Sequence, residues 1–193
     1  MYASRRDSLN LESYRKVREY IEPMDICLVA GEGPVAREIQ FWTQSDYSHW
    51  ATAGWDGSVC MVSEAVQPET RKVSMSSRVE VFSGLIDVYR LKPDIRRLVN
   101  KDAAWEWLTR ASGYDYPEEM ILHDWKCIVF GEDRVKHFPN SDDPRTHRVC
   151  SALGHAALRI HGMPQMKEYD CCVWPKHGAD PAWTNYQFTL TWP

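Results

Sequence analysis

The sequence predicts an α+β fold in which an antiparallel sheet packs against helices. Strand-like runs fill the middle of the chain, and two of them flank the Asp-Gly pair at residues 56–57, the strongest short-range signal for a β-hairpin. Apolar residues with helical spacing lie on either side of this region, at 34–43, 100–111 and 150–161. The predicted order is therefore helices, mixed strands, helices and a final strand.

The N-terminal part contains three predicted elements. Apolar residues near helical spacing predict a helix from Ser8 to Ile21, which Pro23 ends. The apolar run at 26–30 predicts a short buried strand. Residues 31–34, Gly-Glu-Gly-Pro, then turn the chain into a helix that continues to about residue 43.

The central and C-terminal parts contain the remaining elements. Asn100 is predicted to cap a helix that ends at Ser112-Gly113. The segment 113–148 is rich in Asp, Pro and His and predicts a long surface loop with a short helix around 117–122. Strands are predicted from their apolar and β-branched residues at 48–54, 58–66, 71–74, 79–82, 85–91 and 185–192.

A single domain is expected for residues 1–193, because the length falls in the common domain range and 44% of the residues are hydrophobic. Within this domain, residues 1–22 are predicted to form an N-terminal helical extension. Residues 113–148 are predicted to form a long loop or insertion.

Charge and cysteine usage limit the function and the compartment. The net charge of −4, with no run of basic residues, argues against a nucleic-acid partner. No apolar run approaches the length of a transmembrane segment, and no secretory signal is visible, so a cytoplasmic location is expected. In a reducing compartment the six cysteines are expected to remain free thiols.

The predicted hairpin brings a histidine and a glutamate together. If Asp56 and Gly57 form the loop, His49 pairs with Glu64, and directly opposed residues share a face with Cβ atoms roughly 4.5–5.5 Å apart. A slip of one residue would separate the two side chains. The same face carries apolar residues, namely Ala51, Ala53, Cys60 and Val62. A carboxylate on such a face needs a partner, so Glu64 is predicted to orient His49.

Cys150 is the candidate nucleophile. It opens the helical segment 150–161, where unpaired backbone N–H groups and the positive end of the helix dipole stabilise a thiolate. Gly154 and Ala157 are small residues on the same side of this helix, so the helix can approach a sheet closely. His49 would then act as the general base for the Cys150 thiol.

The other six histidines are weaker candidates for catalysis. His147 precedes the Cys150 helix and is interpreted as a substrate contact. His155 lies on the far side of that helix, and His161 is about 16 Å along its axis from Cys150. Three more are interpreted as loop histidines: His123, His137 and His177.

A metal site is the competing interpretation of the cysteines and histidines. One loose cluster consists of His147, Cys150 and His155, and another of Cys171, Cys172 and His177. Structural zinc sites normally show paired ligands at short spacing. Neither cluster has that spacing, so the sequence predicts no metal and no other cofactor.

Three motifs occur in a distinctive order: Ser48-His49, Ser63-Glu64-Ala65 and Val149-Cys150-Ser151. In this order the sequence resembles the circularly permuted NlpC-type papain-like enzymes, the YiiX/YebB-like group, which are relatives of the lecithin:retinol acyltransferase-like proteins. Papain-like enzymes carry the cysteine before the histidine, whereas the permuted group places the histidine strand first and the cysteine helix last. The resemblance covers about residues 24–190 and implies a papain-like α+β fold of permuted topology.

The resemblance implies a cysteine hydrolase with the triad Cys150, His49 and Glu64. We interpret the protein as an amidase or peptidase that cleaves a peptide or peptidoglycan-type amide through an acyl-enzyme, with the Cys150 backbone N–H contributing to oxyanion binding. Two alternatives stay open. One is a lipid acyl hydrolase or acyltransferase with the same triad, since members of the group also act on acyl lipids. The other is a binding module in which the triad is idle.

Overall fold

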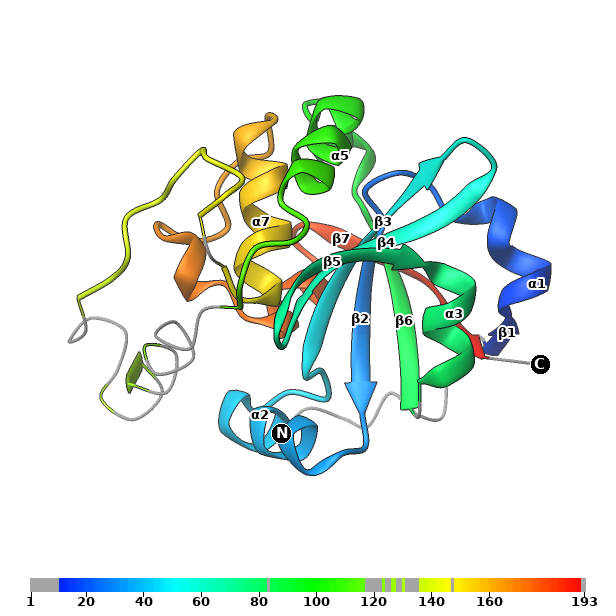
Figure 1. Ribbon diagram of the computed structural model, residues 1–193, viewed down its shortest axis with the longest axis horizontal. Helices are drawn as coiled ribbons and strands as arrows, with labels where there is room; N and C mark the ends of the chain where they lie inside the picture. Colours follow the sequence, from blue (N-terminus) through cyan, green and yellow to red (C-terminus); the bar gives the residue numbers. More distant parts are fainter. Residues whose placement is uncertain are drawn as a thin grey trace.

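The computed structural model describes residues 11–82, 84–116, 123, 126, 127, 130, 136–146 and 148–191. Its centre is a seven-stranded sheet with the strand order β1-β7-β6-β2-β3-β4-β5 (Figure 1). Neighbouring strands are antiparallel except β1 and β7, which are parallel. The strands are β1 (Leu11–Ser13), β2 (Ile26–Gly31), β3 (His49–Asp56), β4 (Val59–Val66), β5 (Glu69–Ser74), β6 (Gly84–Leu91) and β7 (Thr184–Thr191).

Short helices connect and cover these strands. In the described part of the chain, none of them is long and apolar enough to cross a membrane. The α-helices are α1 (Tyr14–Val17), α2 (Pro34–Thr43), α3 (Met75–Val81), α4 (Pro93–Arg96), α5 (Lys101–Arg110) and α7 (Cys150–Ile160). The 3-10 helices are η2 (Arg18–Tyr20), η4 (Asp170–Cys172) and η5 (Pro175–Ala179).

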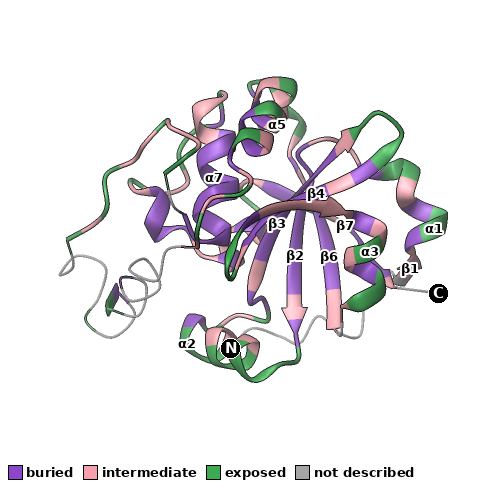
Figure 2. Ribbon diagram, viewed as in Figure 1, coloured by how far each residue is buried: buried purple, intermediate pink, exposed green. Residues whose placement is uncertain are grey.

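Helices pack on both faces of the sheet. On one face, α5 and α7 cover a core that includes Leu28, Trp50 and Tyr89. On the other face, α1 and α3 cover a core that includes Val29 and Ala51. Figure 2 shows that α7 and the inner strands are almost entirely buried, whereas α2 and α3 present exposed surfaces. The predicted α+β class, an antiparallel sheet packed against helices, is confirmed.

The first described residues differ from the helix predicted over 8–21. Residues 11–13 form β1, and only 14–17 are α-helical before the 3-10 turn of η2. β1 pairs with β7, which would otherwise expose unpaired backbone groups at the edge of the sheet. The apolar spacing that predicted a long helix reflects three residues buried against the sheet: Tyr14, Val17 and Ile21.

The strand predicted at 79–82 is wrong, because residues 79–81 belong to helix α3 and Phe82 is its C-cap. The Ser74 side chain accepts a hydrogen bond from the Ser77 backbone N–H and caps the helix. Met75 and Val79, four residues apart, are both buried, which is the spacing of one helix face. The β-branched valines dominated the sequence signal, but the cap and the buried pair determine the structure.

The β3–β4 hairpin forms with a register two residues away from the predicted one. Asp56 pairs with Val59, so that Gly57 and Ser58 are the loop, and Ala51 rather than His49 lies opposite Glu64. Gly57, the first loop residue, has a φ of 57°. Two-residue hairpin turns require a positive φ at this position. A shift of two residues leaves every side chain on its predicted face.

Candidate active site

Helix α7 places Cys150 at its first position. Val149 is the N-cap and provides no side-chain cap, so backbone N–H groups of the first turn remain available to an anion. The helix lies tightly on β3, because a Cβ atom added to Gly154 would come within 2.4 Å of Trp50 Nε1. The predicted close approach of this helix to the sheet is confirmed.

The first residue of β3 and the first residue of α7 meet at one end of the sheet. His49 and Cys150 lie close enough for each residue to shift the pKa of the other. Both residues line the same cavity. They therefore form a thiol–imidazole pair that a bound molecule can reach.

Glu64 is diagonal to His49 across the hairpin, and its carboxylate is fully buried. His49 Nε2 lies 2.9 Å from Glu64 Oε2, a contact that the diagonal position allows for long side chains. The predicted partnership thus holds with a different register. Because Nε2 contacts the carboxylate, Nδ1 is the ring nitrogen left for the Cys150 thiol.

Two arginines also hold the Glu64 carboxylate, and neither was singled out from the sequence. Arg71, opposite Glu64 on β5, donates from Nε and Nη2 to Oε1 at 3.0 and 2.7 Å. Arg78 of α3 donates from Nε to Oε2 at 3.0 Å. The Gln67-Pro68 turn signal between 58–66 and 71–74 could have predicted the Arg71 pairing. Arg78 could not be found, because its helix was predicted to be a strand.

These charges shift the pKa values of all three residues. Burial raises the pKa of the Cys150 thiol, but His49 and the backbone N–H groups of Trp50 and Ser151 outweigh it, and the pKa falls below its ordinary value. Burial opposes the charged form of His49, yet Cys150 and Glu64 raise its pKa to about 9. Burial also disfavours the Glu64 carboxylate, but His49, Arg78 and Arg71 lower its pKa to about 2. These shifts favour a thiolate–imidazolium pair beside an ionised carboxylate.

The cavity next to Cys150 has a volume of about 420 Å³. Such a volume suits a small molecule or one segment of a larger substrate. Its walls come from α2, the end of β4, the start of α7 and the segment around residue 174. Most lining side chains are apolar, including Val35, Ile39, Trp42, Val66, Tyr116 and Trp174.

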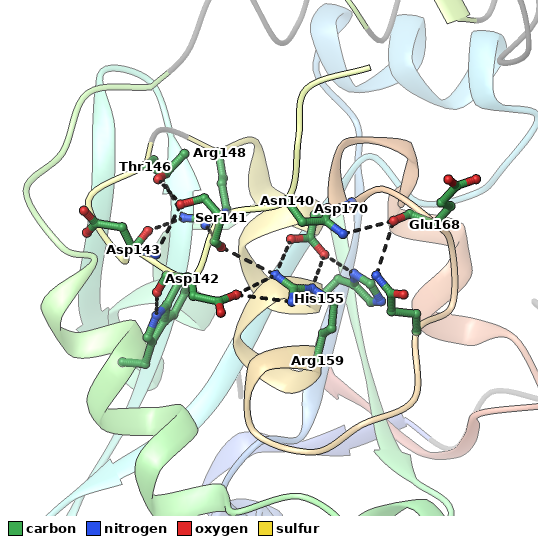
Figure 3. Close-up of polar contacts among 12 residues, drawn as sticks. Asn140, Ser141, Asp142, Asp143, Thr146, Arg148, His155, Arg159, Glu168 and Asp170 are labelled. Carbon is green, nitrogen blue, oxygen red and sulfur yellow. Dashed lines mark hydrogen bonds and ion pairs between the residues drawn. The ribbon is translucent and has the colours of Figure 1, made fainter. Parts of the chain in front are cut away.

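The other predicted positions lie elsewhere. His147, the expected substrate contact, is outside the described residues. His155 is fully buried and its Nδ1 contacts Asp170 Oδ1 at 2.8 Å, next to Arg159 (Figure 3). His177 accepts a hydrogen bond from the Trp174 backbone N–H, and burial lowers its pKa to about 4. These interactions give His155 and His177 structural partners.

Two histidines that the sequence placed in loops belong to a second cluster. His123, His137 and Cys171 bring their ligand atoms within 4.8 Å of one another. No disulfide joins any of the six cysteines. Local sequence spacing does not reveal this group, because His123 and Cys171 are 48 residues apart.

Comparisons with known proteins identify the fold. No protein-family model matches the sequence, and no curated protein matches it. The chain is similar to a solved structure described as the crystal structure of metalloprotein yiiX from Escherichia coli O157:H7, DUF1105. The two share 16% sequence identity over 89% of this chain and 98% of that chain, with a TM-score of 0.60. The protein thus has a YiiX-like α+β fold, in agreement with the expected relation to the YiiX/YebB-like group, while the permuted papain-like order remains a prediction.

Proposed function

We propose that the protein is a cysteine hydrolase that cleaves an amide bond through an acyl-enzyme on Cys150. The observation that carries this proposal is the charge arrangement at the site. Cys150, whose pKa His49 lowers, lines the same cavity as His49, and Nε2 of His49 lies 2.9 Å from the buried Glu64 carboxylate. A nucleophile, a base and an orienting group in this sequence are the parts that acyl transfer requires.

The proposed reaction uses the thiolate as nucleophile. The Cys150 sulfur attacks the carbonyl carbon, and the resulting oxyanion is met by backbone N–H groups at the start of α7. When the C–N bond breaks, the His49 imidazolium donates its proton to the leaving amine. Water then attacks the thioester while His49 accepts a proton, which releases the acid and restores the thiolate.

Glu64 and the two arginines have a positioning role in this scheme. The Glu64 carboxylate holds His49 Nε2, which leaves Nδ1 as the ring nitrogen for the thiol in this scheme. Arg71 and Arg78 keep the carboxylate ionised and fixed. The imidazole ring therefore keeps one orientation throughout the proposed cycle.

A second candidate substrate is an acyl lipid, and a specific observation favours it. The cavity is lined mainly by apolar side chains, and α2, which forms one wall, also exposes Val35 and Phe41 to solvent. An acyl chain could occupy such a wall by burial of apolar surface. The same triad would then form a fatty acyl-enzyme.

Mass spectrometry of the intact protein tests both candidates. The protein is incubated with a pool of peptide amides and, separately, with phospholipid vesicles, then quenched in acid to preserve thioesters. A peptidyl mass on Cys150 supports the amidase, and a fatty acyl mass supports the lipid hydrolase. Cys150→Ala must lose the adduct in either case. If no adduct and no product forms with either pool, the idle binding module becomes the better description.

A further inference from the structure

A second group of thiols and imidazoles lies next to the start of α7. We call it the Cys–His cluster and define it by five residues: His123, Cys127, His137, Cys171 and Cys172. All three cysteines and His123 are buried. We propose that the Cys–His cluster binds a zinc ion.

Two distances within the cluster are close to those around a tetrahedral ion. His123 Nε2 lies 3.1 Å from His137 Nδ1, and the Cys171 sulfur lies 3.9 Å from His123 Nε2. Zinc–nitrogen bonds of about 2.0–2.1 Å and zinc–sulfur bonds of about 2.3 Å place ligand atoms at tetrahedral corners about 3.3 Å apart for N···N and about 3.5 Å for N···S. These two spacings differ from the tetrahedral values by a few tenths of an ångström, and all three ligand atoms lie within 4.8 Å of one another. One ion between the three ligand atoms would satisfy them together.

Two cysteines are positioned to supply the fourth ligand. The Cys127 sulfur lies 3.7 Å from His123 Nε2, and the Cys172 sulfur lies 3.4 Å from His137 Nδ1. Either would complete a set of two imidazoles and two thiolates, which is a common structural zinc set. Thiolate and imidazole ligands also favour zinc over magnesium or calcium, which prefer oxygen.

The protein chain holds η4, which carries Cys171 and Cys172, independently of any metal. Asp170 contacts His155 Nδ1 at 2.8 Å and Arg159 Nε at 3.0 Å, and its backbone N–H donates to Asn140 Oδ1 at 2.7 Å (Figure 3). Asn140 follows His137 by three residues, so this contact also fixes the segment that carries His137. Ligands on both sides are therefore held near their binding positions before an ion arrives.

The surroundings of the cluster are those of a closed structural site. The His123 ring lies 5.2 Å from the Phe138 ring, and the His137 ring lies 4.8 Å from the Tyr169 ring. Cys171 and Cys172 also pack with Val149 and Ala152 at the start of α7. A buried site with enough ligands to fill all four positions stabilises the fold rather than activating water. Zinc would tie His123 and His137 to η4, which supports the helix that carries Cys150.

The direct test measures metal in the full-length protein. Protein purified in reductant without chelator is expected to contain stoichiometric zinc by inductively coupled plasma mass spectrometry. Adding zinc to stripped protein should raise the melting temperature, since a ligand that binds only the folded state stabilises it. Cobalt, used as a spectroscopic probe, should give thiolate-to-metal charge-transfer bands and the visible bands of a tetrahedral site.

Variants assign the ligands. Cys171→Ser and His137→Ala should each weaken zinc binding by at least ~100-fold, more than the loss of most outer-shell partners. Comparing Cys127→Ser with Cys172→Ser identifies the fourth ligand, because only replacement of the ligating cysteine weakens the cobalt charge-transfer bands. Cys60→Ser is the matched control, since this buried thiol belongs to the core on the opposite sheet face and its loss should leave zinc content unchanged.

The outcomes separate this proposal from the proposed function. Cys150→Ala should retain zinc, because Cys150 is not a ligand. Stripped wild-type protein that takes up neither zinc nor cobalt overturns the zinc proposal, as does full zinc retention in a folded Cys171→Ser/His137→Ala double variant. Neither result bears on whether Cys150 forms an acyl-enzyme.

Discussion

The Nε2 atom of His49 lies 2.9 Å from Oε2 of Glu64, although Glu64 pairs with Ala51 across the hairpin. The same carboxylate accepts hydrogen bonds from Arg71 and Arg78. One buried negative charge therefore interacts with two arginines and, when His49 is protonated, with an imidazolium as well. Because each oxygen of Glu64 has its own donors, removing different neighbours should have different costs.

Arg71→Met should destabilise the protein more than Arg78→Met. Within the described residues, Glu64 Oε1 accepts hydrogen bonds from Arg71 alone, whereas Oε2 keeps His49 when Arg78 is removed. Leaving a buried charged acceptor without its donors costs about 1.5–3 kcal/mol, and we expect about 1 kcal/mol for Arg78→Met. Urea denaturation at constant m-value measures both.

Exposure of Arg71 is the effect that could reverse this order. Its side chain is 42% exposed, against 15% for Arg78, and exposed ion pairs contribute little. Arg71→Lys is the control, since it retains a donor and a positive charge but not the fork geometry. If Arg71→Met costs less than Arg78→Met, solvent screening outweighs the loss of donors at Oε1.

Acid should remove the stabilisation that Glu64 provides. Because its folded-state pKa is lowered from an ordinary 4.5 to about 2, this stabilisation is complete above about pH 4.5 and is lost as the pH falls toward 2. The size of the shift corresponds to roughly 3 kcal/mol. Urea unfolding of wild type and Glu64→Gln between pH 2 and 6 gives the free energy of unfolding of each protein. The difference in how the two free energies change with pH measures the contribution of Glu64.

The comparison with Glu64→Gln is needed because another carboxyl acts in the opposite direction. Burial raises the pKa of Asp25 to about 6, with Arg90 only partly offsetting it. Asp25 therefore reduces stability as the pH rises from about 4 to 6, and it does so in both proteins. Equal slopes in wild type and Glu64→Gln would contradict the assignment of a lowered pKa to Glu64.

The faces of the hairpin could be predicted from the sequence more reliably than its register. Strand residues alternate with a period of two, so the two-residue difference between predicted and observed registers left His49 and Glu64 on one face. The position of Gly57 decided the register, and it depends on backbone torsion angles that an Asp-Gly pair does not fix. Contact between the two side chains followed from the face, not from direct pairing.

The charged partners and the second cluster could not be predicted in the same way. Arg78 reaches Glu64 from a helix that local sequence signals predicted as a strand. The Cys–His cluster joins segments separated by 14 and 48 residues, and no local pattern encodes that proximity. Both depend on how distant elements pack. The position of Cys150 at the start of a helix could be predicted, because a helix start is a local feature.

Gly154→Ala should displace α7 from the sheet and lower the reactivity of Cys150. The added Cβ would lie 2.4 Å from Trp50 Nε1, and overpacking of this kind costs about 1–3 kcal/mol. Gly33→Ser is the matched control, because a Cβ there has nothing within 4 Å and serine is favoured at this N-cap position. Melting temperature and the rate of Cys150 alkylation are the two measurements. Unchanged values in Gly154→Ala would show that the helix does not need this close approach.

Cys150 should be the first cysteine to react with iodoacetamide near pH 6. Its pKa is lowered, whereas burial raises the pKa of Cys27 well above its ordinary value and that of Cys60 to about 11. Because the His49 pKa is raised to about 9, the imidazolium persists below about pH 9 and keeps the sulfur ionised down to the lowered pKa of the thiol. Peptide mapping after brief exposure measures the rate at each cysteine.

His49→Ala should shift the alkylation of Cys150 to higher pH. Without the imidazolium, burial opposes ionisation and only the backbone N–H groups of Trp50 and Ser151 still favour the thiolate. Glu64→Gln should have a smaller effect, because His49 remains but loses part of what stabilises its positive charge. In the zinc-loaded protein, Cys171 should react slowly, since a metal-bound thiolate is shielded. If Cys150 reacts no faster than Cys171 or Cys172 in stripped protein, and His49→Ala leaves its pH profile unchanged, Cys150 is not the activated nucleophile.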